Sequence, residues 1–189
     1  MNLTLLVKLQ PTPDQAAALR ATMERFNAAC NAIAVVAFRE RTANKIRLQK
    51  LVYRDIRAQF GLSAQLTVRA ISKVAEAYKR DRRIQPTFRP YGAILYDRRI
   101  LSWKGPDRVS ILTLAGRQII PVVLDGYHRA RLERIRGQAD LIYRDGQFYL
   151  AVVVDVPEPP PLQPDDWLGV DLGILTFSPR LKPGDSFSR

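Results

Sequence analysis

Residues 3–15 read Leu3-Thr4-Leu5-Leu6-Val7-Lys8-Leu9-Gln10-Pro11-Thr12-Pro13-Asp14-Gln15. The odd-numbered side chains up to Leu9 are all apolar, which is the pattern of a strand with one buried face. Pro11 interrupts this strand. A helix start follows, because Thr12 can act as the N-cap, Pro13 suits the first helical position and Gln15 completes a capping box. The stretch therefore predicts a strand that leads directly into a helix.

Three helices are expected after this strand, each with apolar side chains at steps of three and four. The first contains Cys30, which we interpret as a small core residue rather than a nucleophile. The second spans residues 45–60, with Leu51 on its expected buried side, and ends at Gly61. The third begins after the capping residue Ser63 and is expected to turn a basic face outward.

From residue 93 onward the apolar period changes to two, which predicts short strands. Asp145-Gly146 is typical of a two-residue hairpin turn. Because the first strand fits the same sheet, the pattern predicts an α+β fold: a small antiparallel barrel or sandwich interrupted by a three-helix lobe. The expected strands are 93–96, 100–103, 109–114, 118–124, 141–143 and 148–154, with a basic helix at 126–136.

The same pattern predicts how the chain is divided. Residues 1–11 and 93–156 are expected to form the β-barrel, and residues 12–92 the inserted helical lobe. Residues 157–166 are rich in proline and should form a stiff, extended linker. Residues 167–189 are expected to begin another domain.

The charge balance indicates a polyanionic partner. Thirty Lys and Arg residues against eighteen Asp and Glu residues give a net charge of +12, which favours nucleic acid or an anionic membrane surface. No apolar run is long enough for a membrane span, so we expect nucleic acid and no membrane. One cysteine and one histidine cannot build a four-ligand zinc site, and the single cysteine is typical of a reducing cytoplasm. A cytoplasmic, nucleoid-associated protein is expected.

Residues 69–104 concentrate this charge, with ten basic side chains against three acidic ones. Cations can neutralise phosphates, and the interleaved Phe88, Tyr91, Tyr96 and Trp103 could stack on unpaired bases. For any one of these residues, a solvated helix face or a core aromatic is the favoured interpretation, whereas the cluster as a whole favours nucleic acid. Charge does not distinguish RNA from DNA. The candidate nucleic-acid-binding residues are Arg69, Lys73, Lys79, Arg80, Arg82, Arg83, Arg89, Arg98 and Arg99, and Lys104 belongs to the same cluster.

An apolar run ends with one carboxylate at residues 169–173, which read Gly169-Val170-Asp171-Leu172-Gly173. Three interpretations are open. Asp171 could accept hydrogen bonds within its own turn. It could be the first acid of a ribonuclease H-like nuclease, in which several acids bind one or two Mg²⁺ ions. It could also belong to the phosphate-binding turn of an actin-like ATPase, although that fold places the motif at the start of a long domain.

Taken in order, these motifs resemble the TnpB family of transposon-encoded, RNA-guided DNA endonucleases, which are relatives of type V CRISPR effectors. The similarity covers about residues 3–174 and is carried by four segments. They are the strand–Pro-Thr-Pro-Asp-Gln–helix opening, residues 88–103, residues 140–150, and Leu168-Gly169-Val170-Asp171-Leu172-Gly173-Ile174.

The resemblance implies an oligonucleotide-binding, wedge-like barrel and a helical recognition lobe that together hold guide RNA and target DNA. It also implies that residues 167–189 begin a RuvC-like nuclease domain, with Asp171 as the first catalytic acid and a possible Mg²⁺ ligand. The family's later Glu and Asp and its paired zinc-binding cysteines are not found in these 189 residues. We therefore expect a truncated or frameshifted copy that binds nucleic acid but is catalytically incomplete. A nuclease completed by a second chain and a guide-free DNA-binding repressor are the alternatives.

Overall fold

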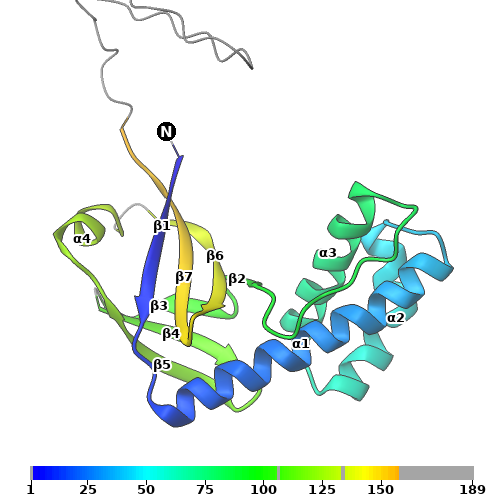
Figure 1. The fold of residues 1–189 in the computed structure, drawn as a ribbon, viewed down its shortest axis with the longest axis horizontal. Coiled ribbons are helices and arrows are strands. Elements are labelled where there is room, and N and C mark those ends of the chain that lie inside the picture. The colour runs from blue at the N-terminus through cyan, green and yellow to red at the C-terminus, as the bar shows by residue number, and fades with distance from the viewer. Residues whose placement is uncertain (1, 106, 133–134, 158–189) are drawn as a thin grey trace, which may run out of the picture. The chain divides into compact units, whose positions relative to one another are not determined.

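The computed structural model describes residues 2–105, 107–132 and 135–157. Within these residues the fold is α+β, with a nearly closed antiparallel barrel of seven strands and four helices (Figure 1). One compact unit, Met1–Val156, contains all of them. Asp171, most of the predicted linker 157–166 and all of residues 167–189 lie outside the described residues.

The elements follow the order that the sequence pattern predicts. The strands are β1 (Asn2–Leu9), β2 (Ile94–Asp97), β3 (Leu101–Trp103), β4 (Arg108–Thr113), β5 (Gly116–Val123), β6 (Ile135–Arg144) and β7 (Gln147–Asp155). The helices are α1 (Pro13–Arg39), α2 (Lys45–Phe60), α3 (Ala64–Arg80) and α4 (Gly126–Leu132).

The first strand occupies the centre of the sheet, whose order is β2-β6-β7-β1-β5-β4-β3. β1 pairs with β7 from Asn2↔Asp155 to Lys8↔Tyr149, and at its other edge with β5. Leu5, Val7 and Leu9 are buried, which confirms the predicted alternation. The two ends of the chain segment that forms the barrel therefore meet at one strand pair.

The barrel nearly closes because its two edge strands are consecutive in the chain. The turn between β2 and β3 brings Ile100 beside β4, where the Ile100 carbonyl accepts from the Leu112 N–H at 2.8 Å. The Ile100 N–H donates back to the Asp97 carbonyl at 3.0 Å. This turn links the sheet edges at one end and leaves β3 and β6 without a shared ladder.

Helix α1 begins with the predicted capping box. The Gln15 N–H donates to Thr12 Oγ1 at 3.3 Å, and the Thr12 N–H donates to Gln15 Oε1 at 3.1 Å. The helix is also tied to the β4–β5 hairpin, since Gln15 Nε2 donates to the Ile119 carbonyl at 3.0 Å and Thr22 Oγ1 accepts from the Leu114 N–H at 3.0 Å. Cys30 is fully buried, which confirms its place in the core.

Two sequence-based expectations are wrong in their details. The helix expected at residues 126–136 ends at Leu132, and β6 begins at Ile135, because the hairpin at Asp145-Gly146 extends its pairing with β7 back to Ile135↔Val154. Leu51, expected on the buried side of α2, is 44% exposed. The buried stripe of α2 advances by four residues at a time through Leu48, Val52 and Ile56, so Leu51 falls at its margin.

Gly61 ends α2 with φ at +61°, a left-handed conformation, and apart from Gly61 and its two neighbours no atom of the described residues lies within 4 Å of the position where a Cβ would stand. Gly61→Ala should therefore destabilise the fold by about 1–2 kcal/mol through backbone strain alone. Gly126→Ala is the control, because Gly126 has no positive φ and is equally uncrowded. Urea unfolding monitored by circular dichroism measures both, and equal stabilities of the two variants would contradict this account.

Candidate nucleic-acid interface

The basic segment begins on α3 and continues through residues 81–93, which we call the connector, to the β2–β3 turn. Most of its predicted binding residues are exposed and have no ion-pair or hydrogen-bond partner for their side chains among the described residues. We call these six the free cations: Lys79, Arg80, Arg82, Arg83, Arg89 and Arg98. Cations without a carboxylate partner remain available to phosphates, and arginine can bind a phosphate with two parallel hydrogen bonds.

Arg69 does not belong to this exposed group, and the expectation that it lies on an outer face is wrong. Its side chain is 17% exposed and forms a salt bridge with Asp97, whose side chain is 12% exposed. The Gln65 amide also donates to Asp97, and the Arg99 backbone N–H donates to Asp97 Oδ1 at 2.9 Å. The cluster attaches α3 to the end of β2.

These donors determine the charge state of Asp97. Burial by itself would raise the pKa of the Asp97 carboxyl. The hydrogen bonds from Arg69, the Arg99 backbone and Gln65 outweigh burial and hold the pKa below its ordinary value of 3.8. Asp97 is therefore ionised at neutral pH and serves as a fixed counterion within the basic segment.

Lys73 is also directed inward, contrary to the expected outer face. Its Nζ donates to the Ala93 carbonyl at 2.7 Å and to Asn27 Oδ1 at 2.8 Å. The same ammonium lies 5.5 Å from the ring centre of Phe26 and 5.2 Å from that of Phe88. Burial of the Lys73 ammonium lowers its pKa, and this effect outweighs the nearby groups that would raise the pKa. Lys73 thus joins α1, α3 and the connector rather than facing solvent.

Two asparagines on α1 hold the connector in place, and the sequence pattern did not single them out. Asn27 Nδ2 donates to the Gly92 carbonyl at 2.8 Å and to the Pro90 carbonyl at 3.0 Å. Asn31 pairs with Phe88 in both directions, accepting from its N–H at 2.8 Å and donating to its carbonyl at 3.0 Å. Two asparagines four residues apart beside an apolar stripe were the available indication, since such residues disfavour helix interiors.

The aromatic residues interleaved with these cations also divide into enclosed and accessible side chains. Tyr96 is fully buried in the barrel, where its hydroxyl donates to the Leu112 carbonyl at 3.0 Å, so it cannot stack on a base. Phe88 packs over Lys73. Tyr91 is 40% exposed, and its ring lies 5.2 Å from that of Tyr143. Among these residues, Tyr91 therefore offers the most accessible ring.

A hollow of about 350 Å³ lies between α3, the connector and β2. It combines both signs of charge, because Glu76 and Asp140 line it together with Lys73 and Arg80. Burial raises the pKa of Asp140 despite the proximity of Lys73. A phosphate inside this hollow would approach carboxylates, so the favourable positions for a polyanion lie along its exposed rim.

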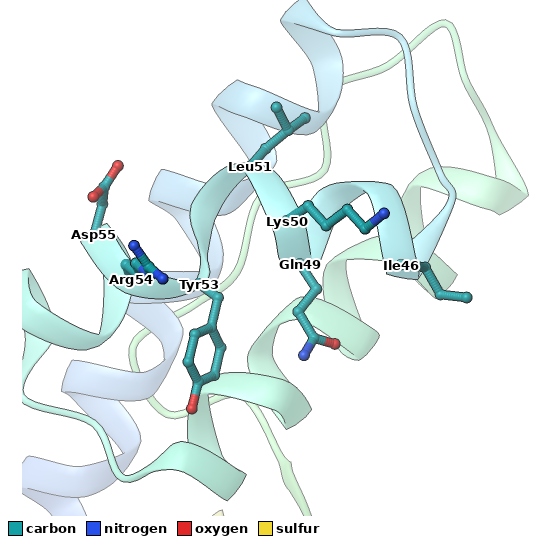
Figure 2. A pocket seen from close by; sticks show the side chains of 7 residues that line it. All are labelled: Ile46, Gln49, Lys50, Leu51, Tyr53, Arg54 and Asp55. Carbon is teal, nitrogen blue, oxygen red and sulfur yellow. The ribbon is translucent and has the colours of Figure 1, made fainter.

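Helix α2 carries a second basic face that the sequence analysis did not include. Lys50, Arg54 and Arg57 are exposed and have no side-chain partner among the described residues. An open hollow of about 560 Å³ runs beside the helix, and Figure 2 shows its lining side chains, all of which project from α2. They include Ile46, which is 70% exposed. A periodicity test for cations at steps of three and four would have found this face.

The predicted catalytic acid does not belong to this basic segment. Asp171 is outside the described residues, so the structure gives it no geometry. Among the residues that are described, no group of three or more His, Cys, Asp or Glu side chains is placed to hold a metal ion.

Comparisons with known proteins assign no family to the chain. No protein-family model matches it, and no curated protein sequence matches it. In the part of the chain that the structure describes, no helix has the length and apolar character needed to cross a bilayer.

The Asp97 cluster predicts a specific dependence of stability on pH. Because the folded pKa is lowered, the ion pair contributes stability above the ordinary value of 3.8 and loses it as the pH falls through the folded value. Asp97→Asn should cost about 2–3 kcal/mol at neutral pH, with the difference from the parent protein shrinking on acidification below about pH 4.

Urea unfolding at a series of pH values measures this difference. The exposed Asp55, which has no side-chain partner among the described residues, provides the control substitution Asp55→Asn, and it should change little at any pH. A constant gap in stability between the parent protein and Asp97→Asn throughout the acid range would contradict the assignment.

Proposed function

We propose that this chain is a nucleic-acid-binding portion of a TnpB-like, transposon-encoded RNA-guided DNA endonuclease. In this proposal the barrel and the three-helix lobe hold a guide RNA and its DNA target. The observation that carries it is the group of six free cations, which lie on a frame fixed by buried polar contacts. The ordered motifs of residues 3–174 support the same assignment.

The basic side chains of this chain differ in whether they have a counterion within the protein. The chain is strongly basic, and the buried Arg69 is already neutralised by Asp97. The free cations have no such partner, so their mutual repulsion is relieved when phosphates replace the mobile ions around them. The backbone on either side of Arg89 is held by Asn27, Asn31 and Lys73, which limits the entropy lost there when a ligand binds. A positively charged surface that is partly held in position before binding suits a polyanionic ligand.

Under the same proposal, the barrel is an oligonucleotide-binding module and Asp171 is the first acid of a RuvC-like domain. A RuvC-like site needs several acids to hold its metal ions. Asp171 alone would not form such a site, and the role that we propose for the barrel and the lobe is binding.

The free cations of the connector provide the direct test. Replacing Arg82, Arg83 and Arg89 together by Ala should weaken binding to single-stranded RNA and lower the salt dependence. The slope of log K against log salt should fall by about 0.7–0.9 for each phosphate that the variant no longer neutralises. Fluorescence anisotropy with a labelled oligonucleotide, measured over a range of salt concentrations, reports both quantities.

A triple variant of the same charge change serves as the control: Arg39→Ala, Arg131→Ala and Arg144→Ala. Each of these arginines already has a partner, respectively Glu40, the Tyr127 ring and Asp145. The control should keep most of the salt slope. Equal reductions of the salt slope in both triple variants would mean that net charge alone causes the effect. Absence of RNA and DNA binding at low salt would overturn the proposal.

The basic face of α2 favours a second candidate function, guide-free binding of duplex DNA. A three-residue turn with Gly61 joins α2 to α3, and an exposed helix bearing cations along one face has dimensions that fit a major groove. Under this alternative the chain should prefer a duplex sequence in the absence of RNA.

Lys50→Ala with Arg54→Ala distinguishes this alternative. The double variant should reduce duplex binding selectively if α2 contacts the DNA, and it should affect single-stranded RNA much less. Arg39→Ala with Arg144→Ala removes the same charge and is the control. A reduction of RNA and duplex binding to the same extent would contradict a separate duplex site on α2.

A further inference from the structure

The barrel is open along one side, between β3 and β6. β2 pairs with β6 only from Ile94↔Leu141 to Asp97↔Gln138, after which the chain turns into β3. Among the described residues, β3 pairs with β4 alone. A hollow of about 360 Å³ lies at this opening, and we call it the β3–β6 slot. Its lining residues are Arg98, Leu101, Ser102, Trp103, Gln138, Ala139 and Val152.

The slot combines an apolar interior with polar side chains. Leu101, Ala139 and Val152 are buried members of the barrel core. Ser102 and Gln138 also line the slot, and neither side chain has a hydrogen-bond partner among the described residues. Such a lining suits a flat, largely apolar group that carries donors and acceptors on its edge.

Trp103 adds an independent observation. Its indole Nε1 is buried and has no hydrogen-bond partner, and it is the one buried side-chain nitrogen or oxygen in that condition among the described residues. An indole nitrogen can only donate, and a buried donor without an acceptor is unfavourable. Trp103 is also one of the residues that line the slot.

We propose that the β3–β6 slot binds one unpaired nucleobase of a single-stranded nucleic acid. This inference rests on the proposed function and specifies part of its ligand. The base packs against the Trp103 ring and the apolar interior, and a carbonyl or ring nitrogen on its edge accepts from the indole N–H. Gln138 pairs with the same edge. Arg98, a free cation at the rim, binds the adjoining phosphate.

Other occupants fit the lining less well. A purely apolar group would leave the buried indole N–H without an acceptor. A phosphate or carboxylate would lie in an apolar interior where, among the described residues, the one lining cation is Arg98, which is exposed at the rim. A base pair within a duplex keeps its edges paired and stacked, whereas an unpaired base offers both a ring face and a free edge.

The experiment compares two octamers with the same number of phosphates: a uridine oligonucleotide and an abasic one. It uses the full chain with Trp167→Phe, so that Trp103 is the remaining tryptophan of the two in the sequence. We expect the uridine octamer to quench Trp103 fluorescence and to bind about fivefold or more tightly than the abasic octamer. A deoxythymidine octamer is the third arm and tests whether the slot accepts DNA as well.

Gln138→Ala should remove most of the preference for bases and leave abasic binding unchanged. Gln118→Ala on β5 is the matched control, because Gln118 does not line the slot and also has no side-chain partner among the described residues. Trp103→Phe keeps a ring and removes the N–H, and it should lower the preference as well. Circular dichroism establishes that each variant is folded.

The outcomes separate the two proposals. Equal binding of both octamers, with unchanged Trp103 fluorescence, would overturn the slot inference while nucleic-acid binding stands. Absence of binding to every octamer at low salt would overturn the proposed function and the slot inference with it. A preference for bases that survives Gln138→Ala and Trp103→Phe would place base recognition elsewhere and overturn the slot inference.

Discussion

The pairing of β1 with β7 is the constraint on which the rest of the structure depends. These strands come from opposite ends of the described chain, and their ladder runs from Asn2↔Asp155 to Lys8↔Tyr149. β1 also joins β7 to β5, so its removal would divide the sheet. Because β1 is the first and β7 the last of the described elements, the chain between them must return to the same place. Such long-range pairing carries a large loop-closure cost and is typical of slowly folding β-structures.

Buried polar contacts hold the three-helix lobe so that the chain can return from it to the barrel. The connector must lead from α3 back to β2, and it does so over the surface of α1. Lys73 is the centre of these contacts, since its ammonium reaches Asn27, Ala93 and two aromatic rings. The cost of burying this ammonium is offset by two hydrogen bonds and by the ring faces. Lys73 therefore has a positioning role, although its charge alone suggested a surface contact.

The basic segment thus contains two kinds of cation with different physical roles. Arg69 and Lys73 are neutralised or enclosed and hold the lobe against the end of β2. Lys79, Arg80 and the arginines of the connector face solvent and keep their charge available. A count of charges cannot separate these groups, because both contribute equally to the net charge. Only the first group has carboxylate, carbonyl or ring partners within reach among the described residues.

Local features of the sequence determined much of the fold. The capping box of Thr12 and Gln15, the left-handed Gly61 and the Asp145-Gly146 hairpin all depend on atoms a few residues apart, and all appear as predicted. The buried alternation of β1 and the core position of Cys30 followed from periodicity. For the candidate interface, the sequence located the basic segment but assigned Arg69 and Lys73 to the wrong face.

The tertiary structure alone decided the strand order, the extension of β6, the exposure of Leu51 and the roles of Asn27 and Asn31. It also decided that Tyr96 is enclosed while Trp103 lines an open slot. Each of these depends on a partner far away in the chain. A periodic pattern in the sequence predicts which side chains share a face. Long-range strand pairing and side-chain packing determine which other part of the chain covers that face. That difference in range is the physical reason why the sequence determined the elements and the structure determined the surface.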